Sequence, residues 1–309
     1  MRNYRPLGVE LVTLVYMALT AALTLLWRES IDVWGQMLLR RGIVLLFMAA
    51  AGAVWMCWPC RWTVMLRGVP LLLFLVQWYP ELYEFCKQFP YLDHLFARAD
   101  QWLWGGQPSL TFADDCPSCL FSELMCLGYY SYYYLMIVTM LAYYFVDIGR
   151  SNRAAFIFLC SFFLFYALFI CIPVAGPQYY FAAVGTEAAQ TGVLPAVAHF
   201  TDDSPCLSID VQGLFGRLVV GTQEVGERPQ AAFPSSHVGM TLVTLALAWQ
   251  MRRKVLFWVL LPLAALLFAS TVYIKAHYLV DVVGAVVLTP LIYAVAAWLY
   301  RLARPLIDP

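Results

Sequence analysis

The sequence predicts an all-α protein, a polytopic bundle of membrane-spanning helices. Of its 309 residues, 62% are hydrophobic and only 12% are charged, whereas a soluble domain is usually about 45–50% apolar and about 25% charged. The formal charge is zero, from 19 basic and 19 acidic residues, so the basic surplus that nucleic-acid binding needs is missing. The composition excludes a soluble enzyme and a DNA-binding domain and indicates a protein whose partner is the bilayer.

Each predicted span must supply about 20 mainly apolar residues to cross the hydrocarbon core. Eight stretches qualify, at residues 8–27, 42–58, 63–80, 127–147, 154–173, 236–251, 255–275 and 281–300. The first is too long for a signal peptide and no small-residue cleavage pattern follows it, so we expect it to be retained. The third is the weakest, because Arg67 and Pro70 interrupt it, and it could lie in the membrane interface instead.

The spans suggest two units. We expect N-terminal spans over residues 1–62 and a membrane domain with a six-helix core over residues 63–309. Two long connections, 81–126 and 174–235, separate the spans of the second unit. Long loops in compact domains often carry function.

The placement of basic residues predicts the orientation in the membrane. Most of those flanking the last five spans fall on one side, namely Arg150, Arg153, Arg252, Arg253, Lys254, Arg301 and Arg304. This pattern places the termini in the cytoplasm and the two long loops outside, although Arg28, Arg40 and Arg41 would then also lie outside. The short tails favour the inner membrane of a bacterium.

The cysteine pattern leaves two interpretations open. Cys116 and Cys119 lie in the first long loop, where a disulfide is possible on the outer side of a membrane, with Cys86 or Cys206 as alternative partners. A zinc site would need two more ligands, and none is spaced nearby. We therefore expect no metal and no other cofactor.

Two of the four histidines lie in chemically distinctive settings. His277 and Asp281 are four residues apart, one helical turn, so their side chains can meet. A carboxylate bonded to one ring nitrogen would leave the other nitrogen as a nucleophile or base, but Asp281 could equally cap the last helix.

The second setting is the start of the helix predicted at residues 236–251. Pro234 followed by Ser235 and Ser236 is typical of a helix N-terminus. The unpaired amides and the dipole of such a terminus attract phosphate, and His237 lies in the first turn. An ordinary capped span is the plainer interpretation. The two settings together favour a shared anion site.

These motifs resemble the type 2 phosphatidic acid phosphatase superfamily. The sequence has Pro-Ser-Ser-His at 234–237 and Ser-Thr-x5-His-x3-Asp at 270–281, similar to that superfamily's Pro-Ser-Gly-His and Ser-Arg-x5-His-x3-Asp. The His-Tyr-x-x-Asp form at 277–281, and the segments 100–108, 129–134 and 172–177, look closer to the inositol phosphorylceramide synthase branch. The resemblance covers roughly residues 95–300.

The sequence also departs from the superfamily pattern. An earlier motif, a Lys followed by Arg-Pro, is not found in that form, and Thr271 replaces the Arg of the last motif. Transfer of a charged phosphoryl group needs positive partners. We expect Lys275 and Arg228 to supply them, together with Ser235 and Ser236 as ligands of phosphoryl oxygens, although Lys275 could be a snorkelling lysine and Arg228 an ordinary loop charge.

The resemblance implies a metal-independent membrane enzyme acting on a lipid phosphate or phosphodiester. His277 would attack phosphorus and form a phosphohistidine, Asp281 would orient it, and His237 would protonate the leaving oxygen. With water as acceptor the enzyme would be a lipid phosphatase. With a lipid hydroxyl it would be a phosphotransferase, for example moving an inositol phosphate-like head group in sphingolipid metabolism. A transporter or a non-catalytic lipid-binding protein is the alternative from another class.

Overall fold

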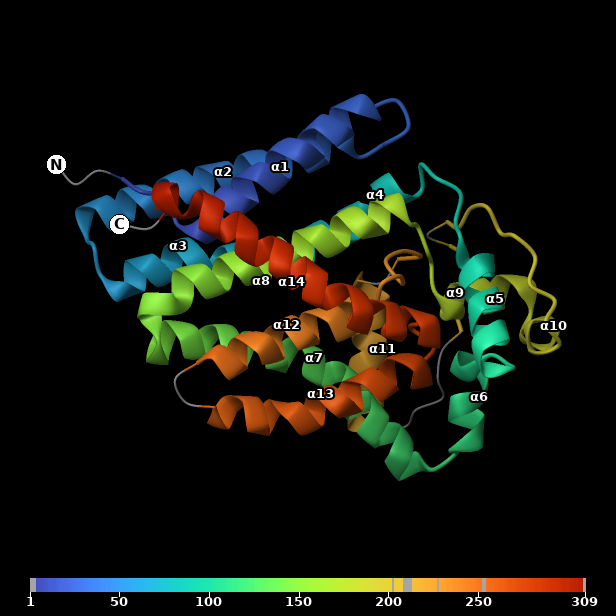
Figure 1. Cartoon of the computed structure of the whole chain (residues 1–309). Helices are drawn as coiled ribbons and strands as arrows, with labels where there is room; N and C mark the ends of the chain where they lie inside the picture. Colours follow the sequence, from blue (N-terminus) through green and yellow to red (C-terminus); the bar gives the residue numbers. More distant parts are fainter. Residues whose placement is uncertain (1–3, 202, 208–212, 227, 252–253, 308–309) are drawn as a thin grey trace.

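The computed structural model describes residues 4–201, 203–207, 213–226, 228–251 and 254–307, and these residues form an all-helical fold. The helices, labelled in Figure 1, are α1 (Gly8–Leu26), α2 (Trp34–Cys57), α3 (Arg61–Leu73), α4 (Leu75–Cys86), α5 (Asp93–Trp104), α6 (Pro108–Asp115), α7 (Cys119–Val146), α8 (Ile148–Cys171), α9 (Pro177–Val184), α10 (Thr186–Gln190), α11 (Leu214–Gly226), α12 (Ser236–Gln250), α13 (Val255–Tyr273) and α14 (Leu279–Ile307). The predicted fold class is confirmed.

Within the described residues, seven helical segments are long and apolar enough to cross a membrane, with α3 and α4 counted together as one. They include all the predicted spans except 236–251, where α12 has only 15 residues. At 1.5 Å per residue this helix is about 22 Å long, shorter than a hydrocarbon core of about 30 Å. It instead packs inside the bundle against α7, α8, α13 and α14.

The third candidate span is a pair of helices, α3 and α4, that meet at Phe74. Pro70 lies within α3, so the break near it was expected. The charge of Arg67 is neutralised inside the protein, because its guanidinium donates to both carboxylate oxygens of Glu10 at 2.7 and 2.6 Å. A buried, bidentate partner explains how an arginine fits in this segment.

A second buried ion pair explains one of the charges that disagreed with the orientation pattern. Arg41 in α2 is buried and donates to Glu81 of α4 at 2.9 Å. Arg40 also contacts Glu81, at 3.4 Å. Arg40 and Arg41 of α2 are thus paired with Glu81 of α4 inside the protein. Their positions therefore need not follow the rule that basic residues lie on the cytoplasmic side.

The two long connections are largely helical. The segment 81–126 contains the end of α4, then α5, α6 and the start of α7, and the segment 174–235 contains α9, α10 and α11. Figure 1 shows α5, α6, α9 and α10 at one end of the bundle, while α1 begins and α14 ends at the other. All nine cysteines lie in described positions and are free, so neither predicted disulfide alternative for Cys116 and Cys119 is present.

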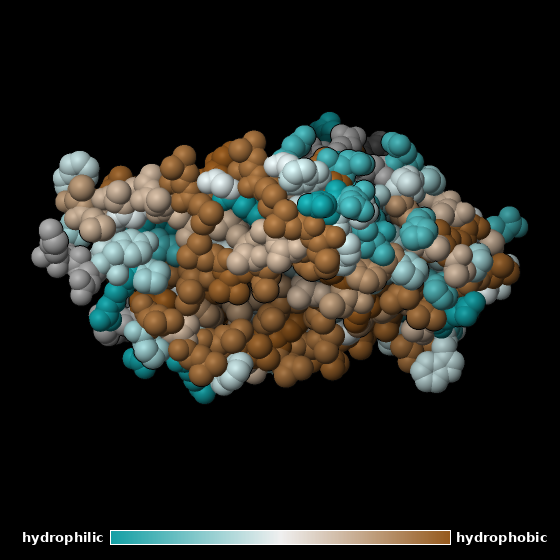
Figure 2. All heavy atoms as spheres, turned by 90° about the horizontal axis from the view of Figure 1, so that it is seen from above, coloured by the Kyte–Doolittle hydropathy of each residue, from teal (hydrophilic) through white to brown (hydrophobic). Residues whose placement is uncertain are grey.

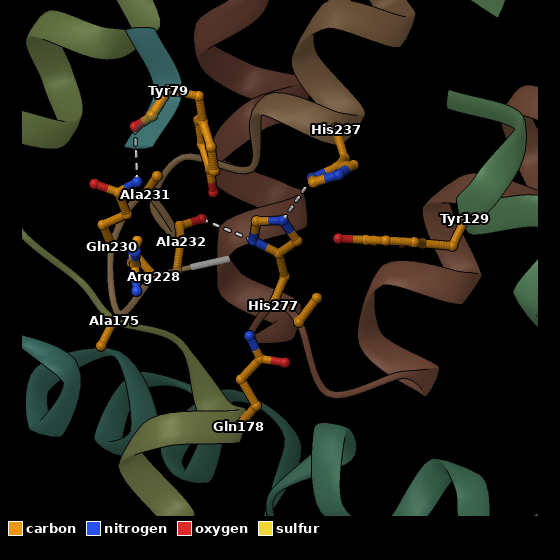
Figure 3. A pocket seen from close by; sticks show the side chains of 11 residues that line it. Tyr79, Tyr129, Ala175, Gln178, Arg228, Gln230, Ala231, Ala232, His237 and His277 are labelled. Atoms are coloured by element: carbon orange, nitrogen blue, oxygen red, sulfur yellow. Dashed lines mark hydrogen bonds between the residues drawn. The ribbon is translucent and has the colours of Figure 1, made fainter. Parts of the chain in front are cut away.

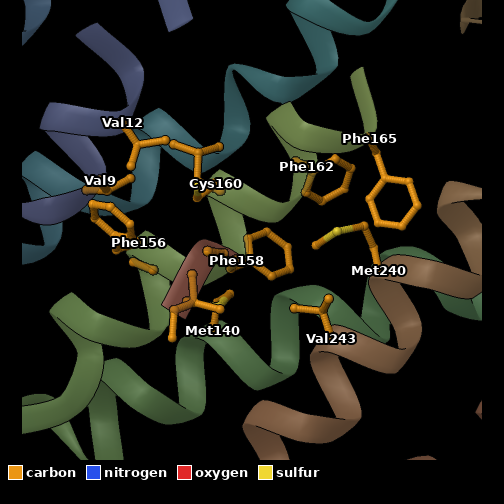
Figure 4. Close-up of a cluster of buried hydrophobic side chains, with 14 of the residues drawn as sticks. Val9, Val12, Met140, Phe156, Phe158, Cys160, Phe162, Phe165, Met240 and Val243 are labelled. Carbon is orange, nitrogen blue, oxygen red and sulfur yellow. The ribbon is translucent and has the colours of Figure 1, made fainter. Parts of the chain in front are cut away.

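Helix α8 forms the centre of the core. Figure 4 shows its phenylalanines between α1 on one side and α12 on the other, with Phe162 and Phe165 beside Met240 of α12. Helices α7 and α13 approach closely at Gly128, where an added Cβ would lie 3.0 Å from the backbone of Leu266. Figure 2 shows a broad hydrophobic area over the middle of the viewed face, as expected for a surface in contact with lipid.

Candidate active site

The short helix α12 brings His237 to the site. Ser235 is its N-cap, and its hydroxyl oxygen accepts a hydrogen bond from the amide of Val238 at 3.4 Å. The predicted helix start is therefore present. The amide of Ser235 donates to the backbone oxygen of Asp281 at 3.2 Å, which joins the beginning of α12 to the first turn of α14.

His277 lies in the tight turn between α13 and α14. The amides of Ala276 and His277 both donate to the carbonyl of Thr271 at 3.1 Å, and Lys275 has a left-handed φ of 66°. The carbonyl of Lys275 accepts from the amide of Gln178, at 3.1 Å. The turn is thus fixed both to α13 and to the start of α9.

The two imidazole rings meet at the end of the bundle. Nδ1 of His237 lies 3.2 Å from Nε2 of His277, at hydrogen-bonding distance, and Figure 3 shows both rings facing the same cavity. His237 also packs between two tyrosines of α7, with ring centroids 4.6 Å from Tyr129 and 4.4 Å from Tyr132. These contacts hold the His237 ring against α7.

The protonation of His277 follows from its other ring nitrogen. Nδ1 lies 2.9 Å from the carbonyl oxygen of Ala232, and a carbonyl can only accept, so Nδ1 carries the proton. In the neutral ring Nε2 then has the lone pair, and it faces His237. Burial lowers the pKa of His277 to about 4, against the opposing effect of the Ala232 hydrogen bond, so the ring is neutral at pH 7.

Asp281 lies close to His277 but does not take its hydrogen bond. Its Oδ2 is 3.7 Å from Nδ1 of His277 and accepts from the amide of Tyr278 at 2.9 Å. The expected carboxylate–imidazole bond is therefore replaced by the Ala232 carbonyl in this state. The buried Oδ1 of Asp281 has no hydrogen-bond partner among the described residues.

Two further buried carboxylates support the site, and sequence reasoning had not assigned them a role. Asp100 of α5 accepts from the amides of Leu279 and Val280 at 2.9 and 2.8 Å, at the start of α14. Asp93 accepts from the amides of Ala175 and Gly176 at 2.9 and 2.8 Å.

Helix α5 thereby fixes the start of α14, directly after His277, and the segment before α9 that lies beside the His277 turn. Asp93 also accepts a 3.1 Å hydrogen bond from the hydroxyl of Tyr278. Burial raises the pKa of Asp93 and of Asp100 to about 6, while the hydrogen bonds from these amides act in the opposite direction. Nothing local in the sequence marks these contacts, since their partners are 82 to 185 residues away.

The cavity at the two histidines is small, about 20 Å³, which is room for a single water. Of the four predicted phosphate ligands, Arg228 lines it, together with Gln178, Gln230, Tyr79 and Tyr129.

The other three predicted ligands are not among the lining residues. Ser235 and Ser236 are buried at the start of α12, and Lys275 is half-buried beside the site. Sequence reasoning missed Gln178 and Gln230, which lie in the connection between α8 and α12 and carry no motif of their own. In the described part of the chain, no group of three or more His, Cys, Asp or Glu residues is placed to bind a metal ion.

Comparison with known proteins adds one finding to this geometry. Residues 96–295, about two thirds of the chain, match a family model described as the PAP2 superfamily. The match includes both histidines, Asp100 and Asp281, and all of α7 to α13. No curated protein and no solved structure matches the chain.

Proposed function

Because the chain belongs to the PAP2 superfamily, a family of membrane phosphatases and phosphotransferases, we propose that it transfers the phosphoryl group of a lipid phosphate or phosphodiester through a covalent intermediate on His277. The observation that carries the proposal is the pair of rings 3.2 Å apart. One ring presents an unprotonated nitrogen, and the other presents a proton donor to the same point.

In the first step, the Nε2 lone pair of His277 attacks phosphorus and forms an N–P bond. The bond between phosphorus and the leaving oxygen breaks, and doubly protonated His237 gives its Nδ1 proton to that oxygen. Burial and the neighbouring His277 lower the pKa of His237 well below its usual value, so we infer that the ring takes up this proton only when the negative phosphate is bound beside it. The ring of His277 becomes positive as the bond forms. Asp281, with Oδ2 already 3.7 Å from Nδ1, is close enough to stabilise that charge.

In the second step, an acceptor hydroxyl attacks the phosphohistidine. Neutral His237 takes the acceptor's proton, the N–P bond breaks, and His277 returns to its neutral form. The same residue therefore acts first as acid and then as base. No proton is gained or lost over the cycle beyond those of the leaving group and the acceptor.

The site must open before either step. For in-line attack, a phosphorus atom and the leaving oxygen must fit between the two reacting nitrogens, which requires a separation of roughly 6–7 Å. The nitrogens are 3.2 Å apart and the cavity has a volume of about 20 Å³. We infer that His237 moves away from His277 when the lipid head group enters.

Side chains that line the cavity would balance most of the charge of the phosphate. Arg228 lines the cavity beside the side-chain amides of Gln178 and Gln230, and a guanidinium pairs with two phosphate oxygens at once. We propose Arg228 as the principal ligand. Ser235, Ser236 and Lys275 would reach phosphoryl oxygens only after the cavity opens.

The acceptor is either water or the hydroxyl of a second lipid, as in transfer of an inositol phosphate-like head group. The test is to incubate the purified protein with a head-group-labelled phospholipid, with and without a long-chain alcohol or ceramide. Free phosphate or phosphorylated head group indicates hydrolysis, and a labelled lipid product indicates transfer. His277→Gln should abolish both reactions, and activity that survives this change would refute the proposal.

We further propose that the histidines face the non-cytoplasmic side of a bacterial inner membrane. Arg150, Arg153, Arg301 and Arg304 lie at the start of α8 and the end of α14, whereas His277 directly precedes α14, and basic residues favour the cytoplasmic side. An impermeant thiol reagent applied to intact cells should label exposed Cys119, at the histidine end, and should not label exposed Cys60. The reverse pattern would contradict this orientation.

A further inference from the structure

A second and much larger cavity lies far from the histidines. Its volume is about 390 Å³. It lies between the first turns of α8 and the last turns of α14, and it is lined by Gly149, Arg150, Arg153, Ala297, Tyr300, Arg301 and Arg304. Four of the seven lining residues are arginines, which no step of the proposed reaction uses.

The position of this cavity separates it from the reaction. His277 directly precedes α14, and Arg301 lies 22 residues after Leu279, the first residue of that helix. At 1.5 Å per residue the helix rises about 33 Å over this distance, more than the roughly 30 Å thickness of a hydrocarbon core. A molecule bound by these arginines therefore lies at the other membrane face and cannot be the one that reacts with His277.

Two of the arginines donate hydrogen bonds to one residue, Gln250, at the end of α12. Arg150 donates from Nη1 to the backbone oxygen of Gln250 at 3.0 Å, and Arg153 donates from Nη1 to its Oε1 at 2.8 Å. The amide nitrogen of Gln250 in turn donates to the hydroxyl of Tyr293 at 2.6 Å. Such fixed guanidinium groups lose little freedom when they bind a ligand.

The charge of the cavity is positive. Asp147 is close to one of the arginines, with its Oδ2 3.8 Å from Nε of Arg150, and it offsets part of the charge. Among the described residues, the four guanidinium groups of the lining outnumber this carboxylate, a composition that suits a phosphate ester because each planar group can pair with two phosphate oxygens.

The surroundings of the cavity are apolar on the side that faces lipid. Trp298 and Leu302 lie in the same last turns of α14 and are 55% and 58% exposed. An aromatic ring beside basic residues is typical of the membrane–water interface. A ligand with a phosphate head and hydrocarbon chains can place its head in the cavity and its chains along this helix.

We propose that this cavity binds the head group of an anionic phospholipid from the leaflet opposite the histidines. Basic pockets between spanning helices at a membrane face are suited to such lipids. The bound lipid would connect α14, which begins directly after the His277 turn, with α8, the centre of the core. This site is independent of the proposed reaction.

The test is native mass spectrometry of the purified protein in detergent, titrated with phosphatidylglycerol, phosphatidylcholine or inorganic phosphate. We compare the wild type with the double variant Arg301→Gln/Arg304→Gln. A matched control is Arg61→Gln, an exposed arginine at the start of α3, at the same end of the bundle. We expect phosphatidylglycerol to bind the wild type at least about tenfold more tightly than the double variant, while Arg61→Gln binds like the wild type.

Two results would overturn the proposal. One is equal binding of phosphatidylglycerol by the double variant and the wild type. The other is inorganic phosphate binding as tightly as the lipid, which would assign the cavity to a free anion. If the double variant fails to purify as a folded protein, Arg304→Gln alone is compared with Arg61→Gln under the same criteria.

Discussion

Replacement of Asp100 by asparagine tests how helix α5 supports the His277 turn. The Asp100 carboxylate is fully buried and accepts from two consecutive amides at the start of α14, at 2.9 and 2.8 Å. Asparagine keeps one acceptor oxygen and places an NH₂ group where the other oxygen was. One buried amide would then lack an acceptor, and the negative charge at the helix N-terminus would be lost.

The magnitude follows from these two losses. A buried donor without a partner costs about 1–3 kcal/mol, and the charge at a partly buried helix terminus contributes up to about 2 kcal/mol. Burial raises the pKa of Asp100 to about 6, which means that the buried charge is itself unfavourable. Removing it therefore offsets part of the loss in the free energy of unfolding. We expect a net loss of about 2 kcal/mol in the free energy of unfolding. A shift of about 1 Å in the His277 turn would lower turnover by roughly a hundredfold.

The assay combines thermal unfolding in detergent with turnover measured well below the unfolding temperature. Asp115→Asn is the matched control, because Asp115 lies at the exposed end of α6. Asp100→Asn should unfold at a lower temperature and turn over far more slowly than this control. The reasoning would be refuted if the two variants had the same unfolding temperature and the same turnover.

Two further predictions concern stability. Arg67→Met should destabilise the protein by about 3–5 kcal/mol, because it leaves the buried Glu10 carboxylate unpaired; the double change Glu10→Gln/Arg67→Met should recover most of this loss in thermal unfolding, and no recovery would contradict the pairing. Burial places the pKa of His277 at about 4, below its usual 6.5, so as the pH falls the unfolded chain binds this proton first. Stability should therefore decrease between pH 6.5 and pH 4, by up to about 3 kcal/mol, and level off below that range. Comparison with His277→Gln cancels the contribution of the other groups, and parallel stability–pH curves for the two proteins would exclude the effect.

Much of the fold could be predicted because its signals are local. Apolar runs identify the seven spans, and Pro234 with Ser235 marks the start of α12. The bounds of α12 were predicted to within one residue, but a stretch of this length is already too short to cross a hydrocarbon core of about 30 Å. An apolar run does not reveal which residue of another helix pairs with a charge inside it. Arg41 and Arg67 lie in spans because Glu81 and Glu10 lie beside them.

In the site, too, local motifs predicted some features, whereas contacts between distant parts of the chain determine others. The spacing of the motifs was enough to place His237 and His277 at one point. The proton on His277 is set by the backbone carbonyl of Ala232, 45 residues away, and no side-chain pattern reports a carbonyl. Asp100 acts on amides 179 and 180 residues along the chain. Such contacts follow from the packing of α5 against α14 and need coordinates to be found.

The most direct test of the account is to trap the covalent intermediate. The protein is mixed briefly with a ³²P-labelled lipid phosphate, quenched in base and digested, and the labelled peptide is sequenced by mass spectrometry. We predict an acid-labile, base-stable adduct on the peptide that contains His277, absent in His277→Gln and slower to form in His237→Gln. Label on Ser235 or Ser236, or turnover of the lipid with no label on His277, would contradict the account.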